Sequence, residues 1–149
     1  MRGIGGLVAA GLLAMLSAAV LSAAAADEMR LSPRKIQDEV KAVVEAQIAA
    51  LQAGDFSAAY AHAALGIKRQ FSERVFALMI RRGYAPLLRA EQVDVGLVRD
   101  DGQDLAQVLV TVTDAAGRST VYRYWLELEE PGWRISGVML EQRPPRGDV

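Results

Sequence analysis

Several residue types that point to a specific chemistry are missing or nearly missing from the chain. It has no cysteine and one histidine, and its 17 Lys and Arg residues nearly balance its 18 Asp and Glu residues. Without cysteine, disulfides, thiolate nucleophiles, cysteine-ligated zinc and a lipid-modified N-terminal cysteine are excluded. A near-neutral chain has no basic field for nucleic acid. One histidine leaves only carboxylates as metal ligands, so we expect neither a metal nor another cofactor.

The N-terminus carries the longest apolar run. Met1-Arg2 is a short positive start, residues 4–20 are almost all apolar, and Ala24-Ala25-Ala26 ends a stretch of small residues. These are the three zones of a secretory signal, and the run is slightly shorter than the roughly 20 residues of a spanning helix. We predict a cleaved signal peptide at 1–26 and no stable membrane span afterwards. An uncleaved anchor is the alternative.

The Ala- and Arg-rich composition points to a bacterial source, so the expected destination is the periplasm or the medium. Residues 27–142 are assigned to one domain, because the remaining length gives room for a single core. Residues 143–149 contain two prolines and a glycine, and we expect them to form a flexible tail.

The first half of this domain has helical periodicity. Ser32-Pro33 offers a hydroxyl cap and a first-turn proline, and Gly54 ends the helix. Between them, apolar residues recur at helical spacing, namely Ile36, Val40, Val43, Val44, Ile48 and Leu51.

Two shorter helices are predicted next. Asp55 can cap a helix over 56–64, and Ser72 can cap another over 73–82. Pro86 is expected to prevent a further helix after them.

The period then changes from 3.6 to 2, which indicates strands. Alternation and turn residues predict four strands, at 93–97, 105–113, 121–129 and 133–141. Short turns between consecutive strands indicate an antiparallel meander. Three helices followed by four strands predict an α+β fold whose helices pack on one face of a curved sheet.

Alternation in the strand over 121–129 divides its side chains between two faces. The set Tyr122, Tyr124, Leu126 and Leu128 should meet the helices. The outer face holds Trp125 among charged residues, with Arg123 beside it and Arg134 on the next strand. We interpret Arg123, Trp125 and Arg134 as candidates for a homodimer or partner interface. An ordinary surface aromatic is the alternative.

The order of several short motifs resembles a known family. The motifs are Gly54-Asp55-Phe56, Ala59-Tyr60-Ala61, Phe71, Phe76, Met79, Tyr84-Ala85-Pro86 and Gly132-Trp133-Arg134-Ile135-Ser136-Gly137-Val138. Together they resemble the bacterial domain of unknown function 4864 (DUF4864) over roughly residues 36 to 140. The element order is also similar to the nuclear-transport-factor-two-like, or cystatin-like, α+β cone that ketosteroid isomerases and many small lyases share.

The resemblance implies a fold and assigns no activity. Members of the family usually have an apolar residue where this chain has His62, so no catalytic role passes to His62. The pocket Asp, His and Tyr residues of the superfamily enzymes find no matching positions here.

The interior of such a cone is the place for a small apolar ligand. The candidate lining residues are Tyr60, Phe71, Met79, Tyr84 and Tyr124, although aromatics at these spacings also make an ordinary core. Arg81, Arg82 and Arg89 form a basic cluster around Tyr84. This cluster either meets an anionic ligand or neutralises a helix C-terminus, and the second interpretation is favoured.

We therefore favour a non-catalytic module that binds a small ligand or another protein. The alternative is a small cofactor-free isomerase, lyase or hydrolase working inside the cone. That class requires a buried Asp or His with a shifted pKa beside a tyrosine, and the sequence does not decide whether the protein is an enzyme.

Overall fold

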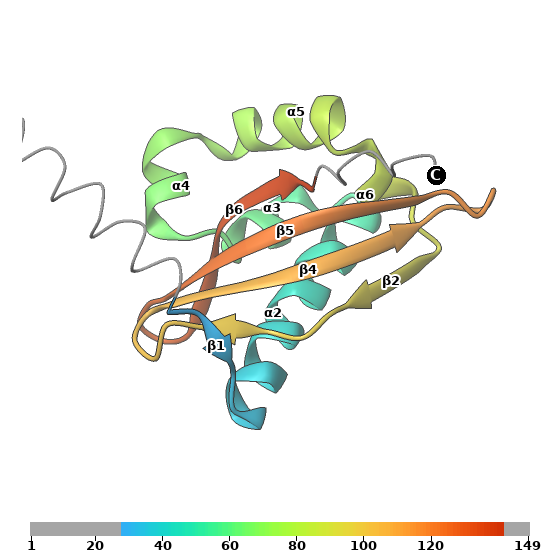
Figure 1. Ribbon diagram of the computed structural model, residues 1–149. Coiled ribbons are helices and arrows are strands. Elements are labelled where there is room, and N and C mark those ends of the chain that lie inside the picture. The colour runs from blue at the N-terminus through green and yellow to red at the C-terminus, as the bar shows by residue number, and fades with distance from the viewer. Residues whose placement is uncertain (1–27, 142–149) are drawn as a thin grey trace, which may run out of the picture.

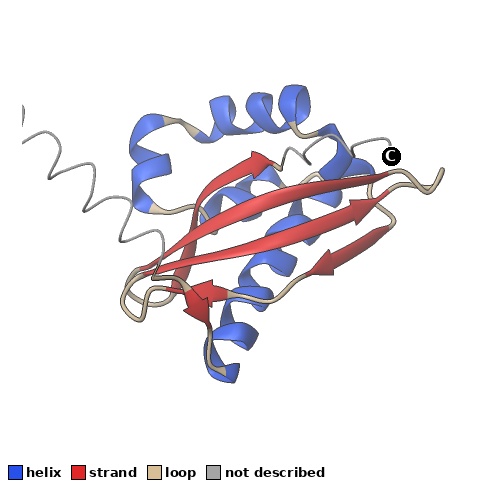
Figure 2. Cartoon of the chain, viewed as in Figure 1, coloured by secondary structure: helices blue, strands red, loops and turns tan. Residues whose placement is uncertain are grey.

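The computed structural model describes residues 28–141. The predicted signal peptide at 1–26 and the predicted tail at 143–149 lie outside the described residues. Within them, helices cover one face of a single antiparallel sheet and leave the near face of Figures 1 and 2 without a helix. The α+β class and the antiparallel sheet predicted from the sequence are thus confirmed.

The helical layer has one long helix and four short ones. They are α2 (Arg34–Gln52), α3 (Phe56–Ala61), α4 (Leu65–Gln70), α5 (Glu73–Gly83) and α6 (Ala85–Arg89). The Asp55 carboxylate accepts a hydrogen bond from the backbone N–H of Ala58, and the Ser72 hydroxyl accepts one from Val75. Both caps predicted from the sequence are therefore confirmed.

The sheet is built around two long central strands. Its strands are β1 (Arg30–Leu31), β2 (Gln92–Val95), β3 (Arg99–Asp100), β4 (Leu105–Thr113), β5 (Ser119–Leu128) and β6 (Trp133–Leu140). The order is β1-β3-β4-β5-β6, and β2 pairs with the other end of β4. Consecutive strands β4, β5 and β6 form the predicted meander.

The pairing along β4 on the side away from β5 is interrupted, with β2 at one end of β4 and β3 at the other. Between them, the backbone N–H of Gly96 donates to the Leu109 carbonyl at 2.9 Å. A Cβ at Gly96 would stand 3.0 Å from that oxygen, so the close approach of the two backbones requires glycine there. The predicted strand over 93–97 therefore ends at Val95.

The expected three helices and four strands were an undercount. The helix expected over 56–64 ends at Ala61, because the backbone of His62 and Ala64 hydrogen-bonds to Ile135 of β6. Pro86 does not prevent α6, since it lies in the first turn, where a helix needs no N–H donor. A short strand, β1, also precedes the first helix.

Two further details of the structure differ from the prediction, one at the start of α2 and one on β5. Ser32 does not cap α2: the cap position is Pro33, which makes no side-chain bond. On β5, Tyr122, Tyr124 and Leu126 are buried as predicted, whereas Leu128, the last residue of the strand, is 46% exposed.

The core lies between α2 and the inner face of the sheet. Its most buried members are Val40, Val44, Ile48 and Leu51 from α2, and Val108, Val110, Val112, Tyr124 and Leu126 from the sheet. Each large apolar side chain contributes about 1.5–3 kcal/mol when fully buried.

Polar side chains of α2 set its position against this sheet. The Gln37 amide donates to the carbonyl oxygens of Val98 and Ser32, and its oxygen accepts from the Val98 N–H at 2.9 Å. Gln47 accepts from the Tyr124 hydroxyl, and Gln52 donates to the carbonyl oxygens of Leu87 and Ala90.

Replacing Gln37 with leucine should lower the free energy of unfolding by about 2 kcal/mol, because the Val98 N–H loses its partner inside the core. Urea unfolding should show a lower midpoint at an unchanged slope. Asp38→Ala, on the exposed side of the same helix, is the control and should change stability by less than about 0.5 kcal/mol. Equal effects of the two changes would contradict the role given to Gln37.

Candidate functional site

An apolar groove lies between α5 and β6. Its volume is 210 Å³. We call it the apolar pocket and define it by its lining: Gln47, Ala63, Ile67, Phe71, Phe76, Met79, Ile80, Tyr84, Ile135, Gly137, Val138 and Met139. Phe76 and Ile80 are buried on the inner side of α5, whereas Met79 is 36% exposed.

The two polar side chains in this lining already have partners. The Tyr84 hydroxyl donates to the Val138 carbonyl at 2.7 Å. Gln47 accepts from the Tyr124 hydroxyl at 3.1 Å. No Asp, Glu or His belongs to the lining, so the pocket offers mainly apolar contact and no carboxylate or imidazole.

The structure brings together three of the five residues predicted to line a pocket. Phe71, Met79 and Tyr84 line the apolar pocket, whereas Tyr60 and Tyr124 do not. The Tyr60 hydroxyl donates to the Phe71 carbonyl at 2.6 Å, and its ring packs against Phe76. Tyr60 thus holds the segment between α4 and α5 in place.

Tyr124 is fully buried behind Gln47, and burial raises the pKa of its hydroxyl. Sequence reasoning missed Ile67 and the β6 residues of the pocket. α4 was not predicted at all, and no local signal shows that α5 lies over β6.

The three predicted interface residues belong to the uncovered face of β5 and β6. We define this open sheet face by Gln107, Leu109, Arg123, Trp125, Arg134, Met139 and Glu141. The strand register places Leu109, Arg123 and Met139 side by side, and Trp125 opposite Gly137. Met139 is 62% exposed and Leu109 is 40% exposed.

Arg123 is the centre of a polar network on this face. Its Nη2 and Nε lie 2.7 and 3.0 Å from the two carboxylate oxygens of Glu141, and its Nη1 donates to Gln107. The hydrogen bond from Arg123 lowers the pKa of Glu141. A two-pronged pair of this kind fixes the geometry of the two side chains relative to each other.

His62 lies at the end of α3 beside β6, outside the apolar pocket. Its backbone carbonyl accepts from the Ile135 N–H at 2.8 Å, and its Nδ1 is buried without a partner among the described residues. Burial lowers the pKa of this imidazole, and the charges of Arg134 and Lys68 lower it further. No carboxylate among residues 28–141 is hydrogen-bonded to Nδ1 of His62 to orient it as a general base.

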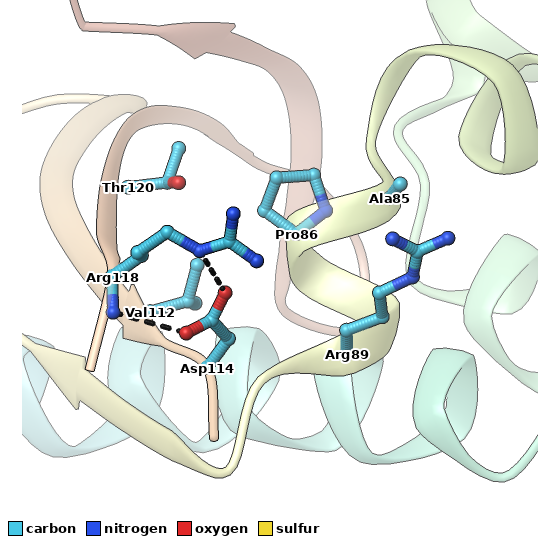
Figure 3. A pocket seen from close by; sticks show the side chains of 7 residues that line it. All are labelled: Ala85, Pro86, Arg89, Val112, Asp114, Arg118 and Thr120. Carbon is cyan, nitrogen blue, oxygen red and sulfur yellow. Dashed lines mark hydrogen bonds and ion pairs between the residues drawn. The ribbon is translucent and has the colours of Figure 1, made fainter. Parts of the chain in front are cut away.

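A second, polar hollow lies where α6 crosses the ends of β4 and β5. Its volume is 330 Å³, and we call it the arginine pocket. Its lining is Ala85, Pro86, Arg89, Val112, Asp114, Arg118 and Thr120, all drawn in Figure 3. An adjoining groove of 560 Å³ is lined by Gly83, Tyr84, Pro86, Thr120, Tyr122 and Leu140.

The acidic stretch over 100–104 is a hairpin turn. Oδ1 of Asp101 accepts from the backbone N–H groups of Gln103 and Leu105, and Oδ1 of Asp100 accepts from Gly102. Across residues 28–141, no three His, Cys, Asp or Glu side chains gather as metal ligands. None of the helices in this part combines the length and apolar character needed to cross a bilayer.

A family model described as Domain of unknown function (DUF4864) matches residues 34–147. The chain belongs to the DUF4864 family. The matched segment runs from the start of α2 through β6, so the DUF4864 domain includes both pockets and the open sheet face. The resemblance inferred from the motifs is therefore confirmed at the level of this family. No curated protein matches the chain.

His62 is the only histidine, so its titration can be followed by NMR without assignment doubt. We expect its imidazole to titrate with a midpoint below the ordinary 6.5, because burial disfavours the charged form. The unfolded chain then binds the proton more readily than the folded protein. Stability should accordingly fall as the pH drops through about 6.5 toward the folded pKa.

Arg134→Gln removes a neighbouring positive charge and should raise the midpoint of His62. Arg74→Gln, on the exposed side of α5, should leave it unchanged. A wild-type midpoint at or above 6.5 would contradict this account of the His62 environment.

Proposed function

We propose that this DUF4864 protein is an exported, non-catalytic binding protein. It holds a small apolar ligand in the apolar pocket and forms a homodimer through the open sheet face. The observation that carries the proposal is the apolar pocket, whose two polar side chains are already hydrogen-bonded within the protein. A ligand there gains from burying apolar surface and meets no group that would transform it.

The size of the pocket limits the ligand. An apolar cavity of about 150 Å³ is enough to hold benzene, and the pocket between α5 and β6 has 210 Å³. A single-ring compound or a short hydrocarbon chain fits this volume. Met79, at the partly exposed rim, gives such a ligand a flexible side chain to pack against.

The proposed fold relationship is with the nuclear-transport-factor-two-like cone. Helices on one face of an antiparallel sheet, a β4-β5-β6 meander and a pocket between helix and sheet support it. A shared architecture carries no function by itself. The proposed export to the periplasm or medium is supported by the positive, apolar and small-residue zones of residues 1–26.

The proposed dimer is supported by the composition of the open sheet face. Trp125 lies opposite Gly137, and the exposed side chains of Leu109 and Met139 flank the Arg123–Glu141 pair. An aromatic anchor surrounded by apolar side chains and a fixed charged pair is typical of protein interfaces. A second copy of the same face would bury these side chains.

Met79→Trp should fill the apolar pocket and weaken binding of the single-ring probe toluene by about tenfold or more. Leu78→Trp is the matched control, because Leu78 has a similar exposure (39%) and does not line the pocket. Calorimetric titration with toluene gives both affinities, and urea midpoints confirm that both variants fold. Equal probe affinity in the two variants, or no binding to the wild type, would place the ligand elsewhere.

Trp125→Glu should give a folded monomer, because a carboxylate at the centre of the dimer contact would be buried without a partner. Trp125→Phe keeps an aromatic ring and should remain a dimer. Native mass spectrometry of protein exported by its own signal measures the oligomeric state and any bound ligand together. A wild-type monomer, or an unchanged oligomer in Trp125→Glu, would refute this interface.

A further inference from the structure

We propose that the arginine pocket and its adjoining groove form a second ligand site, for a small amphipathic carboxylate. The carboxylate binds Arg89 and Arg118, and the apolar body lies across Pro86 onto Tyr122 and Leu140. This site is separate from the apolar pocket of the proposed function and does not depend on it.

Arg118 is held with its outer nitrogens available. Its Nε donates to Oδ2 of Asp114 at 3.0 Å, while Oδ1 of Asp114 accepts from the backbone N–H groups of Ala116 and Arg118. The carboxylate of Asp114 is thus engaged in shaping its own hairpin. Nη1 and Nη2 of Arg118 make no hydrogen bond or ion pair with the described residues, and Figure 3 shows the guanidinium reaching from the hairpin toward Pro86.

Arg89 supplies a second guanidinium from α6. A basic residue at the end of a helix often serves to satisfy the last carbonyls. Here the Gln52 amide donates to the carbonyl oxygens of Leu87 and Ala90 at that end. Arg89 makes no ion pair among residues 28–141, and it lines the pocket with Arg118.

The charge and hydrogen-bonding pattern of the pocket suits an anion. Two guanidinium groups share the lining with one carboxylate, so the pocket keeps a net positive charge. A guanidinium presents two parallel N–H donors that match the two oxygens of a carboxylate. The Thr120 hydroxyl, in the same lining, is a further donor.

The adjoining groove explains why the ligand should also have an apolar body. Pro86 and Thr120 line both hollows, so the two lie side by side. Beyond them, the groove is bounded by Tyr84, Tyr122 and Leu140, and Leu140 is 59% exposed. A ligand bound by its carboxylate at the arginines can therefore bury a hydrocarbon chain there.

Tyr84 marks the boundary between this groove and the apolar pocket. It is the one residue that lines both, and its hydroxyl is bonded to the Val138 carbonyl of β6. The two sites should therefore respond to different substitutions.

The test is calorimetric titration of the full chain with sodium decanoate, at neutral pH and below its micelle-forming concentration. Decanoate should bind, and the matched probes 1-decanol and decyltrimethylammonium should bind at least about tenfold more weakly. Across the series from hexanoate to decanoate, affinity should rise by about fourfold for each methylene that becomes buried. Added salt should weaken decanoate binding.

Arg118→Gln and Arg89→Gln should each reduce decanoate affinity by about tenfold. Arg82→Gln, an exposed arginine of α5 outside both hollows, is the control and should retain wild-type affinity. Met79→Trp should leave decanoate binding unchanged, and Arg118→Gln should leave toluene binding unchanged. Failure of this site is thereby distinguished from failure of the apolar pocket.

Three outcomes would overturn the proposal. Equal binding of decanoate and decanol would remove the role of the arginines. Equal binding of hexanoate and decanoate would remove the role of the groove. If Arg82→Gln lowered decanoate affinity as much as Arg118→Gln, decanoate binding would depend only on the overall charge of the surface.

Discussion

Helix α2 carries glutamines in the stripe that faces the rest of the protein, and an amide in such a place must find a partner. Leaving one unpaired in the core costs more than a packed apolar side chain would gain. Gln37 bonds the backbone between β2 and β3, Gln47 bonds a tyrosine of β5, and Gln52 bonds both carbonyls near the end of α6. Valines alone would let the helix slide or rotate on the sheet, whereas these directional contacts fix its position.

The two hollows follow from that fixed frame. Because Gln52 anchors α6, the short helix crosses the strand ends at one place and leaves the arginine pocket beneath it. α5 is attached at one end through α6 and near the other through Tyr60, which bonds the Phe71 carbonyl. Its middle then spans β6 without closing onto it, and the apolar pocket is the space that remains.

The elements with strong local signals could be predicted from sequence, and those defined by distant contacts could not. Alternation predicted the bounds of β4, and hydroxyl or carboxylate caps predicted the starts of α3 and α5. By contrast, α3 ends where it does because residue 135 bonds its C-terminus, and α4 begins without any side-chain cap. Tyr60 and Tyr124 are of a residue type that often lines pockets, but their hydroxyls find partners inside the protein. Arg89 and Arg118 line the same pocket because α6 crosses the sheet, and no local sequence pattern indicates that crossing.

The interruption between β2 and β3 has a consequence for the protein in a crowded solution. An exposed sheet edge invites pairing with a strand of another molecule and so promotes aggregation. Here β2 ends at Val95, β3 is already paired with β1, and the N–H and C=O of Val98 are occupied by Gln37 and Ser32. A foreign strand finds no continuous row of donors and acceptors along this side. This side of the β-sheet is thereby kept from growing into an intermolecular sheet.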